Sequence, residues 1–210
     1  MFITFEGPDG CGKSTQVALL THYLAQQGYA VCHTREPGGT SIGEQIREVL
    51  HNQSNQEMTP RTEVLLYSAS RAQLVDEVIR PALAEGKIVV CDRFYDSTLA
   101  YQGYGRGLDL DMLRQLTAFA TTGLRPDLTI YLDIRPEVGL RRRQMDGGAE
   151  WNRLDAAALD FHERVRVGYR ALIAAEPERW VNIDGEAGIE AVHAQVREAV
   201  TQRLAQRAAG

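Results

Sequence analysis

Residues 7–14 are Gly-Pro-Asp-Gly-Cys-Gly-Lys-Ser, and they match the pattern G-x-x-x-x-G-K-[ST] at every fixed position. Glycines in this pattern let consecutive backbone N–H groups point at phosphate oxygens. Lys13 supplies a charge for the β- and γ-phosphates, and the Ser14 hydroxyl can ligate Mg²⁺. The pattern therefore predicts a nucleoside triphosphate site rather than a glycine-rich turn without a ligand. We expect this site to be formed by Gly7, Asp9, Gly10, Cys11, Gly12, Lys13, Ser14 and Thr15.

Asp9 is an unusual residue for such a loop, because a carboxylate repels the phosphates that the loop would bind. A second ligand, such as a sugar hydroxyl that donates a hydrogen bond to the carboxylate, explains the acid better. The alternative interpretation is a solvated surface carboxylate. The loop sequence by itself leaves both open.

A second candidate for phosphate binding lies at residues 34–50, TREPGGTSIGEQIREVL. Its Pro-Gly-Gly turn leads into a predicted helix, and helical phase would place Arg47 about one and a half turns from the helix start. Arginine forks suit a phosphate, so Arg35 and Arg47 are candidates for this site. A solvated helix residue is the equally acceptable interpretation of Arg47.

An Asp-Arg pair, Asp92 and Arg93, follows the apolar run that we expect to be the third strand. Ligands of open α/β sheets bind beyond the carboxyl ends of the strands, which is where this pair would lie. Asp92 can accept a hydrogen bond from a Mg²⁺-bound water, and Arg93 can bridge donor and acceptor phosphates. The alternative is an ordinary salt bridge at a strand end.

Two tyrosines, an arginine and a glutamine form a candidate base-binding set. Tyr67 and Arg71 are four residues apart on a predicted helix, so they share one face, and Tyr101 precedes Gln102. An aromatic face, an arginine and an amide can together stack on a base and hydrogen-bond its edge. Each tyrosine taken singly is more often a core residue, so the combination carries this prediction.

Short apolar runs without polar alternation alternate with amphipathic stretches along the chain. Runs of this kind are typical of strands covered on both faces. Strands that alternate with helices indicate crossover connections, so we expect an α/β fold with a mostly parallel five-stranded sheet and helices on both faces. The predicted strands are 2–6, 30–34, 87–92, 128–133 and 179–184, and amphipathic helices are predicted at 14–27, 60–85 and 188–207.

The chain has 210 residues and an ordinary balance of 44% hydrophobic and 24% charged residues, which predicts a single domain over 1–210. Its three cysteines lack metal-like spacing and indicate reduced thiols in a cytoplasm. No apolar run is long enough for a membrane span, and the start MFITFEG lacks the features of a signal peptide. A net charge of −5 disfavours a general nucleic-acid binder.

These motifs together resemble the bacterial thymidylate kinases over roughly residues 1–184. The matching segments are FEGPDGCGKST, TREPGGT, LLYSASRAQLV, CDRFYDSTLAYQG and RPDLTIYLDIRPEVGLRRR. The resemblance implies a P-loop kinase fold and transfer of a phosphoryl group from ATP, with Mg²⁺, to dTMP. It also implies a homodimer formed through helices around 41–52, 60–80 and 95–120.

The resemblance implies roles for residues of the acceptor site. Tyr67 would stack on thymine, Arg71 would hydrogen-bond a thymine carbonyl, and Gln102 would complete the nucleoside pocket. Tyr101 would pack near C2′ and disfavour a ribose, while Asp9 would accept from the 3′-hydroxyl. The expected acceptor-site residues are Asp9, Glu36, Pro37, Arg47, Tyr67, Arg71, Arg93, Ser97, Tyr101 and Gln102.

Catalysis of this transfer requires positioning and charge neutralisation rather than a strong general base, because the acceptor oxygen of dTMP is already ionised. We expect Lys13, Asp92, Arg93 and Arg153 to be catalytic, with Ser14 and Asp92 at the metal. The variable positions of residues 7–14 hold no arginine, so another segment must supply one.

The expected source of that arginine is a mobile lid around 142–153, where two adjacent glycines interrupt a helical pattern. Arg153 would reach the transferred phosphoryl group, and Arg142 would lie over adenine or the donor phosphates. Asn152 departs from the family, which usually has an acid at that position. The resemblance points to the turn near Asp184 and Gly185 for adenine.

Two other classes of function remain open from the residues alone. One is a kinase for another pyrimidine monophosphate or for a deoxynucleoside, against which Tyr101 and Arg71 favour a deoxy, thymine-like acceptor. The other is a nucleotide-binding module without catalysis, such as a GTP switch. The sequence has no guanine-reading N-K-x-D, and it retains Lys13, Asp92 and Arg93, which favours an enzyme.

Overall fold

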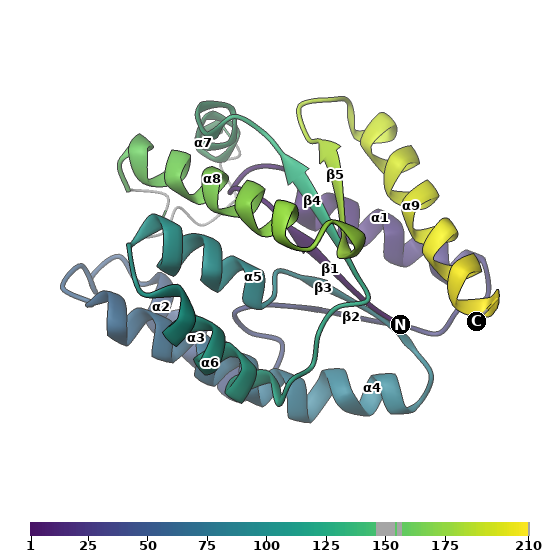
Figure 1. Cartoon of the computed structure of the whole chain (residues 1–210), viewed down its shortest axis with the longest axis horizontal. Helices are drawn as coiled ribbons and strands as arrows, with labels where there is room; N and C mark the ends of the chain where they lie inside the picture. The colour runs from purple at the N-terminus through teal and green to yellow at the C-terminus, as the bar shows by residue number, and fades with distance from the viewer. Residues whose placement is uncertain (146–153, 155–156, 210) are drawn as a thin grey trace.

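A parallel sheet forms the centre of the computed structural model, which describes residues 1–145, 154 and 157–209. Every strand pairing is parallel, and the strand order is β2-β3-β1-β4-β5 (Figure 1). The expected α/β class with five parallel strands is confirmed, and each strand begins and ends within one residue of its predicted bounds. The strands are β1 (Phe2–Glu6), β2 (Val31–Arg35), β3 (Ile88–Asp92), β4 (Leu128–Asp133) and β5 (Trp180–Asp184).

Burial separates the three central strands from the two edge strands. All residues of β1 are buried, as are all but the last residue of β3 and of β4. The edge strands β2 and β5 each expose part of their residues, so the prediction that all five are covered on both faces is wrong for them. An edge strand has a neighbour on one side only, which leaves more of its surface in water.

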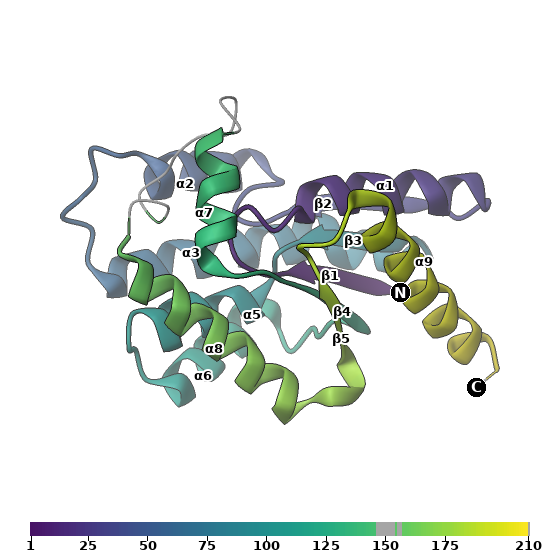
Figure 2. The ribbon, with the colours of Figure 1, turned by 90° about the horizontal axis from the view of Figure 1, so that it is seen from above.

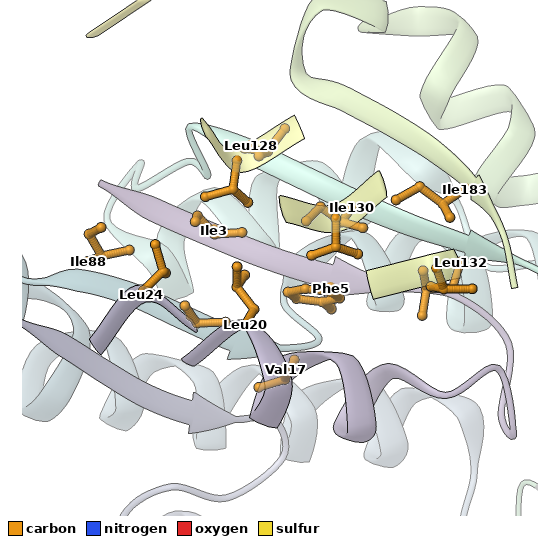
Figure 3. Packing of buried hydrophobic residues seen from close by; sticks show 14 of the residues in the cluster. Ile3, Phe5, Val17, Leu20, Leu24, Ile88, Leu128, Ile130, Leu132 and Ile183 are labelled. Carbon is orange, nitrogen blue, oxygen red and sulfur yellow. The ribbon is translucent and has the colours of Figure 1, made fainter. Parts of the chain in front are cut away.

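Helices cover both faces of the sheet. On one face, α1 and α9 pack against β1 and β4, and Figure 3 shows Val17, Leu20 and Leu24 of α1 directed toward β1. On the other face, the sheet is covered by α8, by the helices between β3 and β4, and by α3 and α4, which precede β3; α8 lies opposite α1 (Figure 2). The helices are α1 (Lys13–Gln26), α2 (Ser41–His51), α3 (Pro60–Leu74), α4 (Arg80–Ala84), α5 (Tyr95–Thr98), α6 (Leu110–Thr121), α7 (Pro136–Met145), α8 (Leu159–Ala175) and α9 (Ile189–Ala209), with a 3₁₀ turn at Pro177–Arg179.

Local sequence explains where several helices begin. The hydroxyls of Thr40 and Thr59 accept hydrogen bonds from the backbone N–H groups of Gly43 and Thr62, which caps α2 and α3. Pro60 occupies the first turn of α3, where a missing N–H costs nothing. These caps fix the ends of the helices that carry candidate site residues.

The predicted helix at 60–85 is one continuous helical segment with a widened turn inside it. Val75–Ile79 is a π-helix between α3 and α4, and Pro81 follows it by two residues. A proline lacks the N–H for the usual bond and its ring crowds the carbonyl four residues earlier, so a local widening relieves the clash. A second π segment, Leu99–Gly105, contains Tyr101 and Gln102.

The carboxyl ends of the strands meet along one edge of the sheet because all pairings are parallel. Each strand ends in a charged residue, namely Glu6, Arg35, Asp92, Asp133 and Asp184. This edge is where open α/β sheets bind ligands. None of the described helices has the length and apolar character needed to cross a membrane.

Candidate active site

A cavity of about 1010 Å³ opens at this charged edge. It is lined by the loop between β1 and α1, by the start of α1, and by side chains of α2, α3 and the segment after β3. The cavity therefore joins the segments that the sequence marked separately for phosphate and for base.

The loop at residues 7–14 has the backbone that its glycines predict. Gly10 and Gly12 have φ angles of 76° and 93°, in the left-handed region that side chains disfavour. A Cβ on Gly10 would lie 2.2 Å from the Gly139 carbonyl oxygen of α7, so a side chain cannot fit there. Lys13 donates to the carbonyl oxygens of Gly7 and Pro8, at 3.1 and 2.9 Å, which holds its ammonium across the loop.

The two expected metal ligands lie in direct contact. The Ser14 hydroxyl donates to Asp92 Oδ2 at 2.7 Å, joining the first turn of α1 to the end of β3. Both side chains line the cavity beside Lys13. A hydroxyl and a carboxylate are the oxygen donors that Mg²⁺ takes from a protein when phosphates and waters complete its shell, so these residues fit the ion.

Arg93 connects several walls of the cavity. Its Nη1 donates to the Gly7 carbonyl oxygen at 3.0 Å, and its Nη2 donates to Asp9 Oδ1 at 2.6 Å and to the Tyr101 hydroxyl at 3.1 Å. Its own φ angle is 71°, a conformation that costs a residue with a side chain about 1 kcal/mol. Backbone strain of this kind clusters at functional sites, and Arg93 lines the cavity.

Asp9 is a partly buried, charged member of this cluster rather than a solvated surface acid. The Tyr101 hydroxyl donates to Asp9 Oδ2 at 2.7 Å, while Oδ1 accepts from Arg93. Burial by itself raises the pKa of Asp9. The positive charges of Arg93 and Lys13 lower it by more than burial raises it, so the pKa of Asp9 lies well below its usual range. Asp9 is therefore a fixed acceptor in the cavity.

A buried network supports Arg93 from behind. Glu6 is fully buried, and its Oε2 accepts from the hydroxyls of Ser97 and Tyr169 at 2.5 and 2.8 Å. Ser97 and Tyr169 in turn accept from Arg93 Nη1, at 3.1 and 3.3 Å. Burial, followed by the neighbouring Asp96, raises the pKa of Glu6 to about 6, against the lowering effect of Arg93.

In another part of the cavity wall, Arg71 is almost fully buried against Glu36. Arg71 Nε donates to Glu36 Oε2 at 2.8 Å, and Nη2 lies 2.7 Å from the same oxygen. Arg71 Nη1 has no hydrogen-bond partner among the described residues. Burial raises the pKa of Glu36 to about 7 although Arg71 lowers it. An unpaired donor on a buried side chain is suited to a ligand carbonyl.

Tyr67 and Gln102 lie beside Arg71 in the cavity wall. Gln102 is buried, and its Nε2 donates to Glu63 Oε1 at 2.8 Å. Tyr67 is half-buried and packs against the apolar cluster that contains Tyr101. An aromatic side chain, an amide and an arginine thus converge from α3 and from the π segment after α5.

Arg47 projects from α2 to the same cavity, where its Nη1 donates to the Pro37 carbonyl oxygen at 3.1 Å. Its neighbour His51 also lines the cavity. Burial, followed by the charge of Arg47, lowers the pKa of His51 to about 4, so this imidazole is neutral near pH 7. Arg47 therefore lines the cavity and bonds Pro37, and it is not a helix residue that points only into solvent.

Arg142 of α7 joins three segments of the cavity wall. Its Nη1 donates to the Gly185 carbonyl oxygen at 3.0 Å and lies 3.5 Å from that of Gly10. The segment Gly185–Ile189 also lines the cavity. This contact joins α7, the glycine loop and the turn after β5, which is where the family resemblance points for adenine.

Known proteins similar to this chain belong to one enzyme family. A family model described as thymidylate kinase matches residues 5–196. The thymidylate kinases of Roseiflexus castenholzii and an Exiguobacterium species are 55% and 52% identical to this chain, covering 98% of it in both cases and 94% and 96% of their own lengths. This chain belongs to the thymidylate kinase family.

The fold agrees with a solved member of that family. The thymidylate kinase from Ehrlichia chaffeensis superimposes with a TM-score of 0.78 at 36% identity, covering 96% of this chain and 98% of that structure. The predicted resemblance is thus confirmed, and the interpretation as a nucleotide-binding module without catalysis is set aside. The glycine loop is hereafter the P-loop of this kinase.

The cavity of this thymidylate kinase brings together almost the whole predicted site. Gly7 does not line it, but its carbonyl oxygen accepts from Lys13 and from Arg93. Arg153 lies outside the described residues, as does most of the predicted lid. Arg35 lines the cavity and pairs with Glu44, and Gly185 lines it whereas Asp184 does not. The other predicted residues that line the cavity are Asp9, Gly10, Cys11, Gly12, Lys13, Ser14, Thr15, Glu36, Pro37, Arg47, Tyr67, Arg71, Asp92, Arg93, Ser97, Tyr101, Gln102 and Arg142.

Sequence reasoning missed several residues that shape the site. Glu6 ends β1 directly before the P-loop, and Glu63 precedes Tyr67 by one helical turn, so both carried a usable positional signal. Tyr169 lies on α8, far along the chain, and nothing in its local sequence distinguishes it from a core tyrosine. His51 likewise ends α2 without any motif.

Proposed function

We propose that this thymidylate kinase transfers the γ-phosphoryl group of ATP to the phosphate of dTMP, giving ADP and dTDP. A single observation carries the proposal. One cavity joins Lys13 of the P-loop to Arg71 and Gln102, and Arg93 contacts both the P-loop and Tyr101. A triphosphate on the P-loop and a monophosphate held by Arg93 would lie end to end.

The acceptor base would occupy the end of the cavity beside Tyr67. Arg71 Nη1, which lacks a protein partner, is suited to donate to a thymine carbonyl, and Gln102 is suited to bond the base edge. The ring of Tyr67 provides a stacking surface. Arg47 and Pro37 border the same space, on the side of α2.

The deoxyribose would lie between Asp9 and Tyr101. Asp9 carries a fixed negative charge and is suited to accept from the 3′-hydroxyl. The Tyr101 ring is held in place because its hydroxyl donates to Asp9 and its face lies 5.0 Å from the Arg93 guanidinium carbon. A rigid ring beside C2′ disfavours the extra hydroxyl of a ribose.

The phosphoryl transfer itself needs charge neutralisation and alignment. Lys13 would neutralise the transferred group from the donor side, and Arg93 would hold the acceptor phosphate. Ser14 and Asp92 would hold Mg²⁺, which neutralises charge on the triphosphate when bound. Arg142 would support the donor nucleotide through its contacts with the P-loop and Gly185.

Arg153 remains our candidate for a further cation at the transferred group, on the sequence argument that the P-loop has no arginine. Arg153→Ala should lower kcat by about 10³-fold if this assignment is right. A loss under about tenfold in a steady-state assay would assign the role to another group.

We also propose that the kinase is a homodimer formed through α2, α3 and α6. Large apolar side chains on these helices are exposed, at 52% for Ile42, 57% for Leu65 and 82% for Phe119. An exposed apolar set on adjacent helices marks an interaction surface. Phe119→Asp should convert a dimer to a monomer in analytical ultracentrifugation, whereas a wild-type monomer would refute the proposal.

Activity is tested directly by coupled ADP release with dTMP, dUMP, UMP, CMP and thymidine side by side. The proposal expects dTMP to have the highest kcat/KM and ADP formation to require Mg²⁺. Preference for free thymidine would overturn the assignment of a monophosphate acceptor. We also expect the enzyme to be active without added nucleic acid or lipid. After cell fractionation, we expect the enzyme in the cytoplasmic fraction.

A further inference from the structure

Glu63 is a fully buried carboxylate that does not line the cavity but bonds a residue that does. Its Oε1 accepts from Gln102 Nε2 at 2.8 Å, and its Oε2 accepts from Arg106 Nη2 at 3.2 Å. Arg106 also lies over the ring of Phe161, with 4.8 Å to the ring centre. The ion pair with Arg106 gives this buried carboxylate a cationic partner inside the fold.

An ionised carboxylate accepts hydrogen bonds and cannot donate them. The Gln102 amide must therefore turn its NH₂ group toward Glu63, because the opposite orientation would place two acceptor oxygens together. Gln102 Oε1 makes no hydrogen bond with any described residue, and Gln102 lines the cavity. The carbonyl oxygen of this amide is thus free to accept from a ligand.

Arg71, which lines the same cavity, is likewise held by a buried carboxylate. Glu36 Oε2 accepts from Arg71 Nε at 2.8 Å, and Nη2 lies 2.7 Å from the same oxygen and donates to the Phe94 carbonyl oxygen at 3.3 Å. Among the described residues, Nη1 has no hydrogen-bond partner. The pocket therefore offers one acceptor, Gln102 Oε1, and one donor, Arg71 Nη1. A pyrimidine with an N3–H donor beside a 4-oxo acceptor matches this pair, and a 4-amino pyrimidine presents the reverse.

We propose that Glu63 is a positioning residue that sets the hydrogen-bond polarity of the base pocket through Gln102, and so selects 4-oxo over 4-amino pyrimidines. The inference rests on the proposed function, in which Gln102 contacts the base. Glu63 itself does not touch the substrate. Its contribution to specificity comes from the one orientation that its charge allows Gln102 to adopt.

A purely structural role for Glu63 makes a different prediction. If the Glu63–Arg106 pair only stabilises the contact between α3 and the segment after α5, its loss should lower activity on every acceptor by the same factor. The ratio of kcat/KM for dTMP to that for dCMP separates the two roles. Specificity is a difference between two affinities, and a uniform loss cancels from it.

The test uses Glu63→Gln, which keeps the shape but can donate as well as accept. The Gln102 amide then adopts both orientations, so the Kd and KM for dTMP should rise about tenfold while those for dCMP hardly change. The dTMP-to-dCMP ratio should fall by about the same factor. Kd values from titration calorimetry give this readout without turnover.

Arg106→Gln is the matched control, because it removes the ion pair but leaves the Glu63 carboxylate as the partner of Gln102. It should keep the wild-type ratio. Glu63→Asp is the second variant, since it keeps the charge beside Arg106 but shortens the reach to Gln102, and it should lower the ratio even if Glu63→Gln does not fold.

The outcomes separate the inference from the proposed function. An unchanged ratio in folded Glu63→Gln or Glu63→Asp, with the melting temperature as the check, overturns the role of Glu63 and leaves the dTMP kinase assignment standing. A wild-type enzyme that does not prefer dTMP to dCMP overturns both. A ratio that falls equally in Arg106→Gln assigns the effect to the ion pair and contradicts the role proposed for Glu63.

Discussion

The two halves of the cavity are built by different means. The half that we assign to the phosphate donor is the P-loop, which is shaped mainly by its backbone, and Lys13 donates to the carbonyl oxygens of Gly7 and Pro8 in that loop. The acceptor half is built from side chains of α2, α3 and the segment after β3. Its main cations, Arg71 and Arg93, are each held by partners from other elements.

This difference follows from what each half must recognise. Phosphates are alike in every nucleotide, so a loop of backbone N–H groups with one lysine suffices for them. A particular base and sugar require donors and acceptors at defined positions, and in our proposal the buried carboxylates Glu36 and Glu63, which bond Arg71 and Gln102, fix those positions. We therefore expect the donor half to be sensitive to backbone changes and the acceptor half to single side chains.

The largest expected effect comes from Arg93, which lies where the two halves meet. Arg93→Ala removes the cation that contacts Gly7, Asp9 and Tyr101, and kcat/KM for dTMP should fall about 10³-fold. Steady-state kinetics with both substrates varied measures this. Arg170→Ala is the control, because Arg170 forms an exposed pair with Asp133, and it should keep wild-type kinetics.

The next effect tests whether backbone shape dominates the P-loop. Gly10→Ala places a Cβ 2.2 Å from the Gly139 carbonyl oxygen at a φ angle of 76°, and it should lower the unfolding free energy by about 3 kcal/mol or more. Gly12→Ala has φ 93° but no described atom within 4 Å, so it should cost only about 1 kcal/mol. Urea denaturation without nucleotide gives both unfolding free energies. If the two variants lose the same unfolding free energy, the clash with Gly139 does not explain the effect at Gly10.

A smaller effect concerns the buried acid of the acceptor half. The folded-state pKa of Glu36 is about 7, above its ordinary value of 4.5, so the folded protein holds that proton more tightly than the unfolded chain does. Its contribution to stability is therefore present below about pH 4.5 and is lost as the pH rises to about 7. Glu36→Gln should lack this decline.

Unfolding free energies of wild type and Glu36→Gln, measured by urea titration from about pH 4.5 to 8, test this directly. From the low to the high end of that range, the unfolding free energy of wild type should fall by roughly 1–3 kcal/mol relative to that of Glu36→Gln. The constant offset from the altered bond to Arg71 does not enter the slope. Two parallel pH profiles would show that Glu36 keeps an ordinary pKa in the fold.

The smallest expected effect comes from the network behind Arg93. Tyr169→Phe removes a hydroxyl that accepts from Arg93 at 3.3 Å and donates to Glu6 at 2.8 Å, and KM for dTMP should rise about threefold. Tyr131→Phe is matched, because its hydroxyl bonds Asp133 at 3.2 Å away from the cavity. An equal rise in both variants would mean that the network does not position Arg93.

Prediction from sequence succeeded where the signal was local. The P-loop, the strand bounds and the shared helix face of Tyr67 and Arg71, which both line the cavity, follow from spacing along a few residues. The assignment of Arg47 stayed open because helical phase does not say what faces a helix. Glu6 and Tyr169 escaped prediction because a buried acid and a core tyrosine acquire their roles only from each other, across 163 positions of sequence.

The sequence by itself determined the phosphate loop, the order of strands and helices along the chain, and the set of side chains able to recognise a deoxynucleotide. Those depend on residue type and on short spacings, which are properties of the chain before it folds. Tertiary structure decided the order of strands in the sheet, and with it which side chains meet at the carboxyl edge. It also decided their electrostatics, because burial and the partners supplied by distant elements are what shift the pKa values of Asp9, Glu6 and Glu36.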